Sequence, residues 1–242
     1  MVSALFHALV YDPIYNGLVF FVDVLPSHDM GVAVVIVTIV VRIILFPLSR
    51  IAIQTQMKMK EVAPDVETIK KKYQKPEEQG RAILDLYREK RVRPFAGFLL
   101  LLVQLPILIG LYWVFAQGGL PDVDTDILYA LVPVPGTVDM EFLGFINMSE
   151  PSFALALLAG VVQFIYTRLS MGPRGQLTAT EASLSKDMAR TFDLQARYML
   201  PTLIGVIGFF IASAAPLYWL TGNLFMIGQE LLSGRRFNGP AK

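Results

Sequence analysis

The chain contains no cysteine and only two histidines, His7 and His28, among its 242 residues. The absence of cysteine excludes disulfide bonds, thiol catalysis and cysteine-ligated metal sites. Two isolated histidines near the N-terminus do not supply the ligand set of a metal site. A glycine-rich phosphate loop and a Ser/His/Asp set are also missing, so we expect no enzyme, no cofactor and no metal.

Charged residues are scarce, and apolar residues are abundant. Only 17% of the residues are charged, whereas 54% are hydrophobic, and the mean hydropathy is +0.53. This composition is too apolar for a soluble domain and typical of a protein that crosses a membrane several times. We expect residues 1–242 to form one all-α membrane domain, and the N-terminus lacks the basic start of a cleavable signal peptide.

Residues 31–48 predict a membrane-spanning helix, because the stretch is apolar over about 18 positions. It contains one full charge, Arg42, and no acidic residue that could neutralise it. A lone guanidinium in a span costs about 3 kcal/mol or more, so it must snorkel, find a partner or face water inside the protein. We predict that Arg42 faces a wet cavity, which is the functional site, and snorkelling is the alternative.

Further apolar stretches predict four more spans. Residues 198–232 are apolar for about 35 positions, too long for one span, and Pro216 near the middle predicts a tight hairpin of two. Residues 13–25 are too short to span and have one polar face, which favours an amphipathic helix in the membrane interface over a buried core helix. The predicted spans are residues 31–48, 95–115, 152–169, 198–214 and 217–232.

The polar segments divide into two kinds by charge. Residues 50–92 are rich in Lys, Glu and Gln and predict a helical hairpin outside the membrane, with a solvated charged loop as the alternative. Every Lys and Arg other than Arg42 lies in residues 50–93, 168–197 or 234–242, whereas the N-terminal segment and the loop 117–151 carry only acids. The positive-inside rule therefore predicts an external N-terminus, and a cytoplasmic hairpin, loop 170–197 and tail 234–242.

Four motifs in this order carry a resemblance to a known family. They are VTIVVRIILFPLSRIAIQTQMKMKEVAPDVETIKKKY (37–73), RPFAGFLLLLVQLPILIGLYWVF (93–115), LLAGVVQFIYTRLS (157–170) and LYWLTGNLF (217–225). The chain resembles the YidC/Oxa/Alb membrane protein insertases over nearly its full length, in the five-span form without a large outer domain. The resemblance implies that five transmembrane helices enclose a hydrophilic groove open to the cytoplasm and to lipid, with Arg42 as its arginine.

The resemblance also implies a function and partners. We expect a bacterial inner-membrane protein that inserts nascent membrane proteins and helps them fold without nucleotide hydrolysis. Its other partners would be the lipid bilayer and, as candidates, the Sec translocon and the ribosome, with no direct nucleic-acid site. A small transporter or channel is the alternative, although no second copy of the fold is visible.

Polar and aromatic residues in the predicted spans are the candidates for lining this groove. A groove glutamine of the family aligns with Tyr166, while Gln163 lies one turn earlier. The resemblance therefore leaves both residues as candidates for this position in the groove. For the polar candidates the alternative is a hydrogen bond between helices, and for Trp219 it is an interfacial aromatic belt. The predicted groove residues are Arg42, Thr38, Gln104, Gln163, Tyr166, Trp219 and Asn223.

Overall fold

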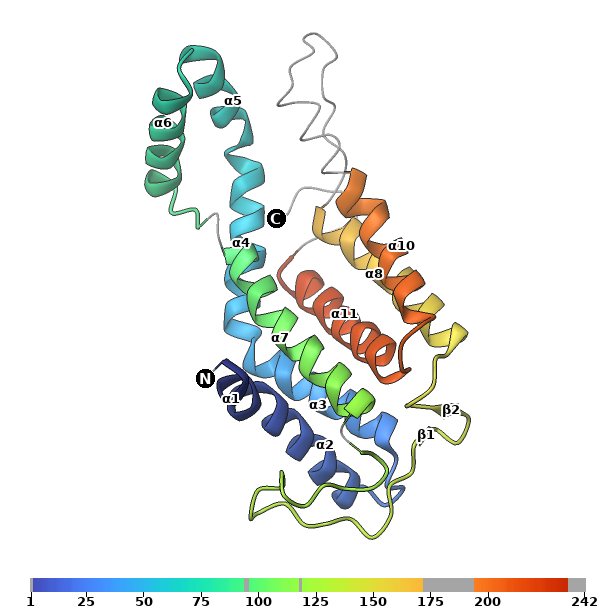
Figure 1. Cartoon of the computed structure of the whole chain (residues 1–242). Coiled ribbons are helices and arrows are strands. Elements are labelled where there is room, and N and C mark those ends of the chain that lie inside the picture. The colour runs from blue at the N-terminus through green and yellow to red at the C-terminus, as the bar shows by residue number, and fades with distance from the viewer. Residues whose placement is uncertain (1, 94–95, 118, 172–193, 235–242) are drawn as a thin grey trace. The chain divides into compact units, whose positions relative to one another are not determined.

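The computed structural model describes residues 2–93, 96–117, 119–171 and 194–234, which are mostly helical (Figure 1). The predicted all-α class is therefore confirmed, while the number of membrane spans stays a prediction. The chain divides into two compact units, one of residues 1–43 and 106–242 and the other of residues 44–105. Most of the predicted loop 170–197 and tail 234–242 lies outside the described residues.

The first unit begins with a continuous helical run. It consists of α1 (Val2–Phe6), the π-helical η1 (His7–Tyr11) and α2 (Asp12–Val24). The helix thus starts well before the predicted residues 13–25. Pro13 does not break it, because the wider π-helical turn before the proline accommodates the missing N–H. The run Ala4–Val24 is 21 residues long and apolar enough to cross a membrane, so the expectation that this segment is too short to span is wrong. Its interfacial position stays a prediction.

Helix α3 (Met30–Ile44) has one buried and one exposed face. Val34, Thr38 and Arg42 repeat every four residues and are buried, whereas Ile39 and Ile43 are exposed. The helix stops at Leu45, and α4 (Phe46–Glu61) follows directly. The predicted span 31–48 is therefore broken near its end, because a proline at position 47 clashes with the carbonyl of residue 43.

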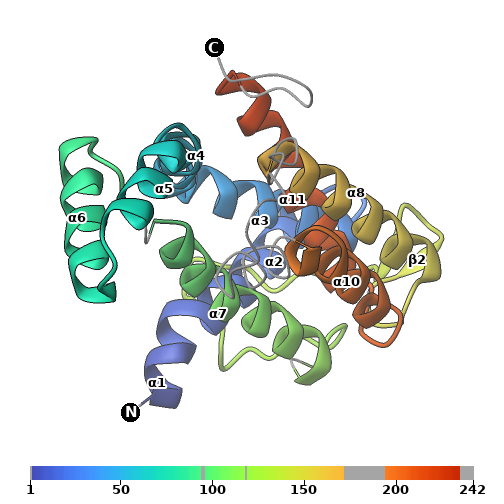
Figure 2. The ribbon, with the colours of Figure 1, turned by 90° about the horizontal axis from the view of Figure 1, so that it is seen from above.

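Three helices of the first unit lie side by side: α8 (Phe153–Met171), α10 (Leu200–Gly208) and α11 (Ala214–Leu232) (Figures 1 and 2). The π-helical η2 (Gln195–Met199) leads into α10. Two helices, α10 and α11, lie where the hairpin of the last two spans is predicted, but the turn between them lies at residues 209–213 instead of at Pro216. Pro216 fits in the first turn of α11, where its missing N–H leaves no intrahelical bond unmade.

Helix α7 (Ala96–Gln117) closely matches the predicted span 95–115. Its C-terminal half belongs to the first unit, where Leu111 and Val114 are buried in the hydrophobic core. Gly110 allows close packing, since a Cβ there would lie 2.9 Å from Val10 and 3.2 Å from Ile14. This core also contains Tyr15, Leu18 and Val22 of α2 and Leu217 of α11.

The long connection 119–151 has little regular structure and is fixed by side chains of α2. Asn16 donates a hydrogen bond to the carbonyl of Ile127 (3.0 Å) and accepts one from the N–H of Tyr129 (2.6 Å). The Tyr15 hydroxyl accepts a hydrogen bond from the N–H of Asp124 (2.8 Å). Long-range side-chain bonds therefore order this connection in place of strands or helices.

Asp29 holds the second half of the same connection. One carboxylate oxygen accepts a hydrogen bond from Val32 N–H at the start of α3 (3.0 Å), and the other accepts one from Leu143 N–H (2.8 Å). Leu143 lies in a small antiparallel hairpin formed by β1 (Glu141–Phe142) and β2 (Ile146–Asn147). The Phe142 side chain covers Gly31, where no room remains for a Cβ.

The second unit contains α4, α5 (Ala63–Lys72), α6 (Pro76–Glu89) and the start of α7. Residues 50–92, for which a helical hairpin is predicted, are thus helical, and α6 begins at Pro76 as prolines in first turns favour. Neither α5 nor α6 contains a buried residue. The pairs Lys75–Glu78 (3.7 Å) and Arg88–Asp85 (3.4 Å) join exposed charges on α6 and at its start.

Two described helical runs are long and apolar enough to cross a membrane, Ala4–Val24 and Phe153–Met171. A third span is possible by length if α3 and Phe46–Met59 form one broken span. Leu102–Gln117 within α7 is apolar but shorter. The described residues therefore support several membrane crossings.

Candidate functional site

Arg42 lies on the buried face of α3, and only 8% of its surface is exposed. The side chain turns away from Ile39 and Ile43, which form the exposed apolar face of the same helix. A snorkelling arginine would lie along that exposed face and carry its charge to water. The burial of Arg42 therefore argues against snorkelling along this face, and a wet cavity around it stays a prediction.

The guanidinium of Arg42 packs against the backbone of Gly222 in α11. A Cβ at position 222 would lie 2.5 Å from Nη2, 2.9 Å from Nε and 3.1 Å from Cζ of Arg42. The Tyr218 ring, one turn earlier, has its centroid 5.9 Å from Cζ, within the range of a cation–π contact. Gly222 and Tyr218 together hold one side of the guanidinium.

Arg42 has no neutralising carboxylate within the described part of the chain. Among the described residues, none forms a salt bridge with it, and its buried Nε has no hydrogen-bond acceptor. A buried charge without a partner is unfavourable for folding, so its position needs another reason. The site is therefore suited to attract a negative group that is not part of the described chain.

Polar side chains connect α8 to α11 beside this cation. Asn223, the residue after Gly222, donates a hydrogen bond to Oε1 of Gln163 (2.8 Å). Gln163 in turn donates from Nε2 to the Thr167 hydroxyl (3.1 Å). All three side chains are buried. Gln163 and Asn223 thus make the interhelical hydrogen bond that was the alternative to a groove-lining role.

The other predicted groove residues have different surroundings. Thr38 is buried and donates its hydroxyl to the carbonyl of Val34 in its own helix (2.6 Å). Trp219 is half-buried and packs against the hydrophobic core. Tyr166 is half-buried on α8, and Gln104 is half-buried on the part of α7 in the second unit. A role in the groove stays a prediction for each of these four residues.

The sequence reasoning missed Gly222, Thr167 and Glu230. Gly222 follows Tyr218 by four residues, so one helix face pairs an aromatic ring with a gap, but only the fold brings Arg42 there. Thr167 follows Gln163 by four residues, a spacing that allows a hydrogen bond on one helix face. Glu230 is fully buried near the end of α11, and its position in an apolar stretch was a readable signal.

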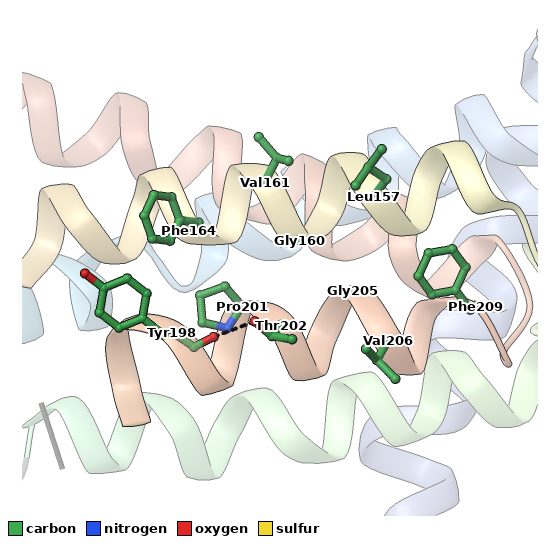
Figure 3. A pocket seen from close by; sticks show the side chains of 10 residues that line it. All are labelled: Leu157, Gly160, Val161, Phe164, Tyr198, Pro201, Thr202, Gly205, Val206 and Phe209. Carbon is green, nitrogen blue, oxygen red and sulfur yellow. Dashed lines mark hydrogen bonds between the residues drawn. The ribbon is translucent and has the colours of Figure 1, made fainter. Parts of the chain in front are cut away.

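A separate groove of about 530 Å³ lies between α8 and α10 (Figure 3). Its walls are almost entirely apolar, and the Thr202 hydroxyl bonds to the carbonyl of Tyr198 (2.8 Å). The two helices approach closely at its floor, where a Cβ on Gly160 would lie 3.3 Å from Cα of Gly205. This groove is distinct in chemistry from the polar site around Arg42.

Fold and site together define a helical membrane protein with a desolvated cation and hydrogen-bonded amides between its helices. Comparison with known proteins specifies the family. A family model described as 60Kd inner membrane protein matches residues 21–240. The chain belongs to this family, and the resemblance to the YidC-type insertases is confirmed.

The relatives include "Membrane protein insertase YidC" of Clostridium tetani, 30% identical over 86% of this chain and 83% of the relative. The protein of the same name from Oceanobacillus iheyensis is 31% identical over 85% of this chain and 75% of its own length. A solved structure, "Active YidC insertase crystal structure with the first transmembrane domain resolved", superposes with a TM-score of 0.57 at 28% identity. It covers 90% of this chain, which spans 45% of that longer one. The chain is accordingly a multi-pass protein of the bacterial inner membrane.

Proposed function

We propose that the chain inserts nascent membrane proteins into the bilayer, in keeping with the name "Membrane protein insertase YidC" of its relatives, and that it also helps them fold. The observation that carries this proposal is the buried, unneutralised charge of Arg42 beside Gly222. A buried positive charge within an apolar fold suits a protein that binds acidic, polar segments of a substrate while they cross the membrane. The proposed orientation has the N-terminus outside and residues 50–92 and the C-terminus in the cytoplasm.

The energetic problem of insertion is the passage of a short polar segment across apolar lipid. A hydrated groove that reaches part-way lowers the cost of removing that segment from water. Arg42 attracts acidic residues of the segment, and the low dielectric of its surroundings strengthens the attraction. The cation would thus act on a passing charge without a covalent step.

Two forces complete the transfer without nucleotide hydrolysis. Each acidic residue that moves outward gains about 2.3 kcal/mol per 100 mV of membrane potential. The apolar segment that follows partitions into lipid with about 25 cal/mol for each Å² removed from water. Both contributions come from the substrate and the membrane, so the protein needs only to lower the barrier.

The test is rescue of a bacterial strain depleted of its own insertase. Expression of this chain is expected to restore growth and the insertion of a reporter membrane protein. A small transporter or channel would not restore either. Loss of rescue with correct membrane localisation of the chain would contradict the proposed function.

A further inference from the structure

Large apolar side chains are exposed together at one end of the first unit. Phe153, the first residue of α8, is 67% exposed, and Phe210, just past α10, is 79% exposed. The loop of the β1–β2 hairpin adds Leu143 and Phe145, which are 59% and 72% exposed. We call these four residues the apolar rim. Large exposed apolar side chains that gather at one end of a unit mark a candidate surface for binding.

Several contacts bring the members of the apolar rim to the same end. The N–H of Ala214, at the start of α11, bonds to the carbonyl of Met148 just after the hairpin (3.2 Å). The rings of Phe153 and Phe209 are 4.9 Å apart, which joins the ends of α8 and α10. Figure 1 shows the hairpin beside these helix ends, and Figure 3 shows Phe209 at one end of the α8–α10 groove.

The apolar rim continues the lipid-facing surface of the spans. Leu157, Val161 and Ile165 follow Phe153 at intervals of four residues along α8, and all are exposed. This helix is long and apolar enough to cross a membrane, so the exposed stripe faces lipid. Phe210 extends the exposed face of α10 in the same way, after Leu203, Val206 and Ile207.

The backbone of Leu143 is an independent indication that this exposed side chain binds something outside the protein. Its φ angle is +54°, a left-handed conformation that is unfavourable for leucine and favoured by Gly, Asn and Asp. The bond from its N–H to Asp29 fixes this backbone, and any residue type except proline would supply that N–H. Since Phe142 covers Gly31 on the protein side, the hairpin gains nothing evident from a leucine side chain that points outward.

We propose that the apolar rim is a membrane-interface anchor, in which Leu143 and Phe145 insert at the headgroup–acyl boundary beside the ends of α8 and α10. The nearby exposed charges are all acidic: Asp139, Glu141 and Glu150. Attraction to anionic lipid is therefore excluded as the driving force, and apolar partitioning into any fluid bilayer suffices. The anchor holds the connection 119–151 on the bilayer surface, and it is independent of the insertase activity.

A spin label tests the anchor directly, because the chain has no cysteine of its own. The variants are Phe145→Cys and, as a matched control in the same connection, Thr137→Cys, which is also exposed. Each labelled full-length protein is placed in phosphatidylcholine nanodiscs, and collision with oxygen and with a water-soluble nickel complex is measured. We expect the label at position 145 to favour oxygen several-fold over the label at position 137.

Two results would overturn the anchor. One is equal nickel accessibility at both positions, which would place residue 145 in water. The other is protection of position 145 from both reagents, which would mean that a protein, such as a second copy of the chain, covers the rim.

Leu143→Asn provides the second arm. Asparagine tolerates the left-handed backbone, so the unfolding temperature in detergent is expected to stay the same or rise. The label at position 145 is expected to become more accessible to nickel in nanodiscs, because part of the anchor is gone. A fall of several degrees in detergent would show instead that Leu143 packs within the protein, and the anchor would be wrong.

Discussion

The two compact units place their charges in opposite settings. In the first unit, Arg42 is buried without a carboxylate and Asp29 is buried with two backbone donors. In the second unit, the charges of α5 and α6 are exposed, and neither helix buries a residue. A buried polar group affects folding or binding strongly, whereas an exposed one contributes little by itself. Substitution of a buried polar group in the first unit should therefore have a large effect, whereas in α5 and α6 only the loss of the whole hairpin should.

The largest expected effect is the loss of the hairpin as a whole. Deletion of residues 61–88 should abolish most insertion activity while the first unit remains folded, because α5 and α6 bury nothing. The measurements are insertion of a reporter protein and the thermal unfolding of the variant in detergent. A deletion variant that inserts every substrate as well as the parent would contradict a recruiting role for the hairpin.

The next effect is on stability in the first unit. Asp29→Ala removes the hydrogen-bond acceptor for Val32 N–H at the start of α3 and the acceptor for Leu143 N–H. We therefore expect the free energy of unfolding to fall by about 2–4 kcal/mol. Thermal or denaturant unfolding in detergent measures this change. The control is Asp126→Ala, an exposed acid of the same connection, for which a change within about 0.5 kcal/mol is expected. Similar losses for both variants would mean that the carboxylate of Asp29 is not what fixes the connection.

A smaller effect should follow from Gly222→Ala. The methyl group would overlap Nη2 of Arg42, so the guanidinium must move, and we expect about a fivefold loss of insertion for acidic substrates, equivalent to about 1 kcal/mol. The matched control is Gly228→Ala in the same helix, where, apart from the adjacent backbone of α11, no atom of the described residues lies within 4 Å of the added Cβ.

In an Arg42→Lys background, Gly222→Ala should lower the insertion of acidic substrates less, because lysine lacks the nitrogen that lies nearest to the added methyl group. An equal loss in both backgrounds would show that alanine at position 222 acts on the fold and not through Arg42. Gly228→Ala should leave activity unchanged, and alanine is the better helix former at either position.

The smallest effect is expected in the second unit. Arg88→Ala removes an exposed pair with Asp85, whose partners are 81% and 72% exposed. Such pairs contribute at most about 0.5 kcal/mol and weaken with salt. Unfolding at low and high ionic strength measures the change. A fall of more than about 1 kcal/mol in the free energy of unfolding would contradict the expected difference between the two units.

The helices could be predicted from the sequence because apolar runs, prolines and charged stretches are local signals. α7 and α8 lie close to the bounds predicted for residues 95–115 and 152–169, and α5 and α6 lie within the predicted hairpin 50–92. The start of the N-terminal helix was not predictable in this way, because a π-helical turn accommodates Pro13. The turn before α11 was misplaced, since a proline within the first turn of a helix resembles one in a loop.

The site was predictable only in part, for a related reason. Arg42 is conspicuous as the one charge in an apolar run, but its contact with Gly222 joins residues far apart in the chain. A glycine has no side chain, so nothing in its chemistry indicates from the sequence that it contacts Arg42. Likewise Asn16 and Asp29 fix the connection 119–151 through long-range bonds that no local pattern indicates.

The proposed mechanism of insertion depends on what the charge of Arg42 does. If it attracts acids of the substrate, Arg42→Lys should keep most of the activity and Arg42→Glu should be worse than Arg42→Ala. If the guanidinium instead supports the fold through its forked geometry, lysine should be as damaging as alanine. Arg42→Met separates folding from function, because removal of a buried, unneutralised charge should not lower the unfolding temperature.

The most direct measurement compares tail reporters that differ only in charge. Protease protection reports the translocation of a tail with acidic residues and of a tail with neutral residues, in the parent and in Arg42→Ala. We predict that Arg42→Ala lowers translocation of the acidic tail far more than translocation of the neutral tail. Equal loss for both tails, with the protein still folded, would contradict electrostatic attraction by Arg42.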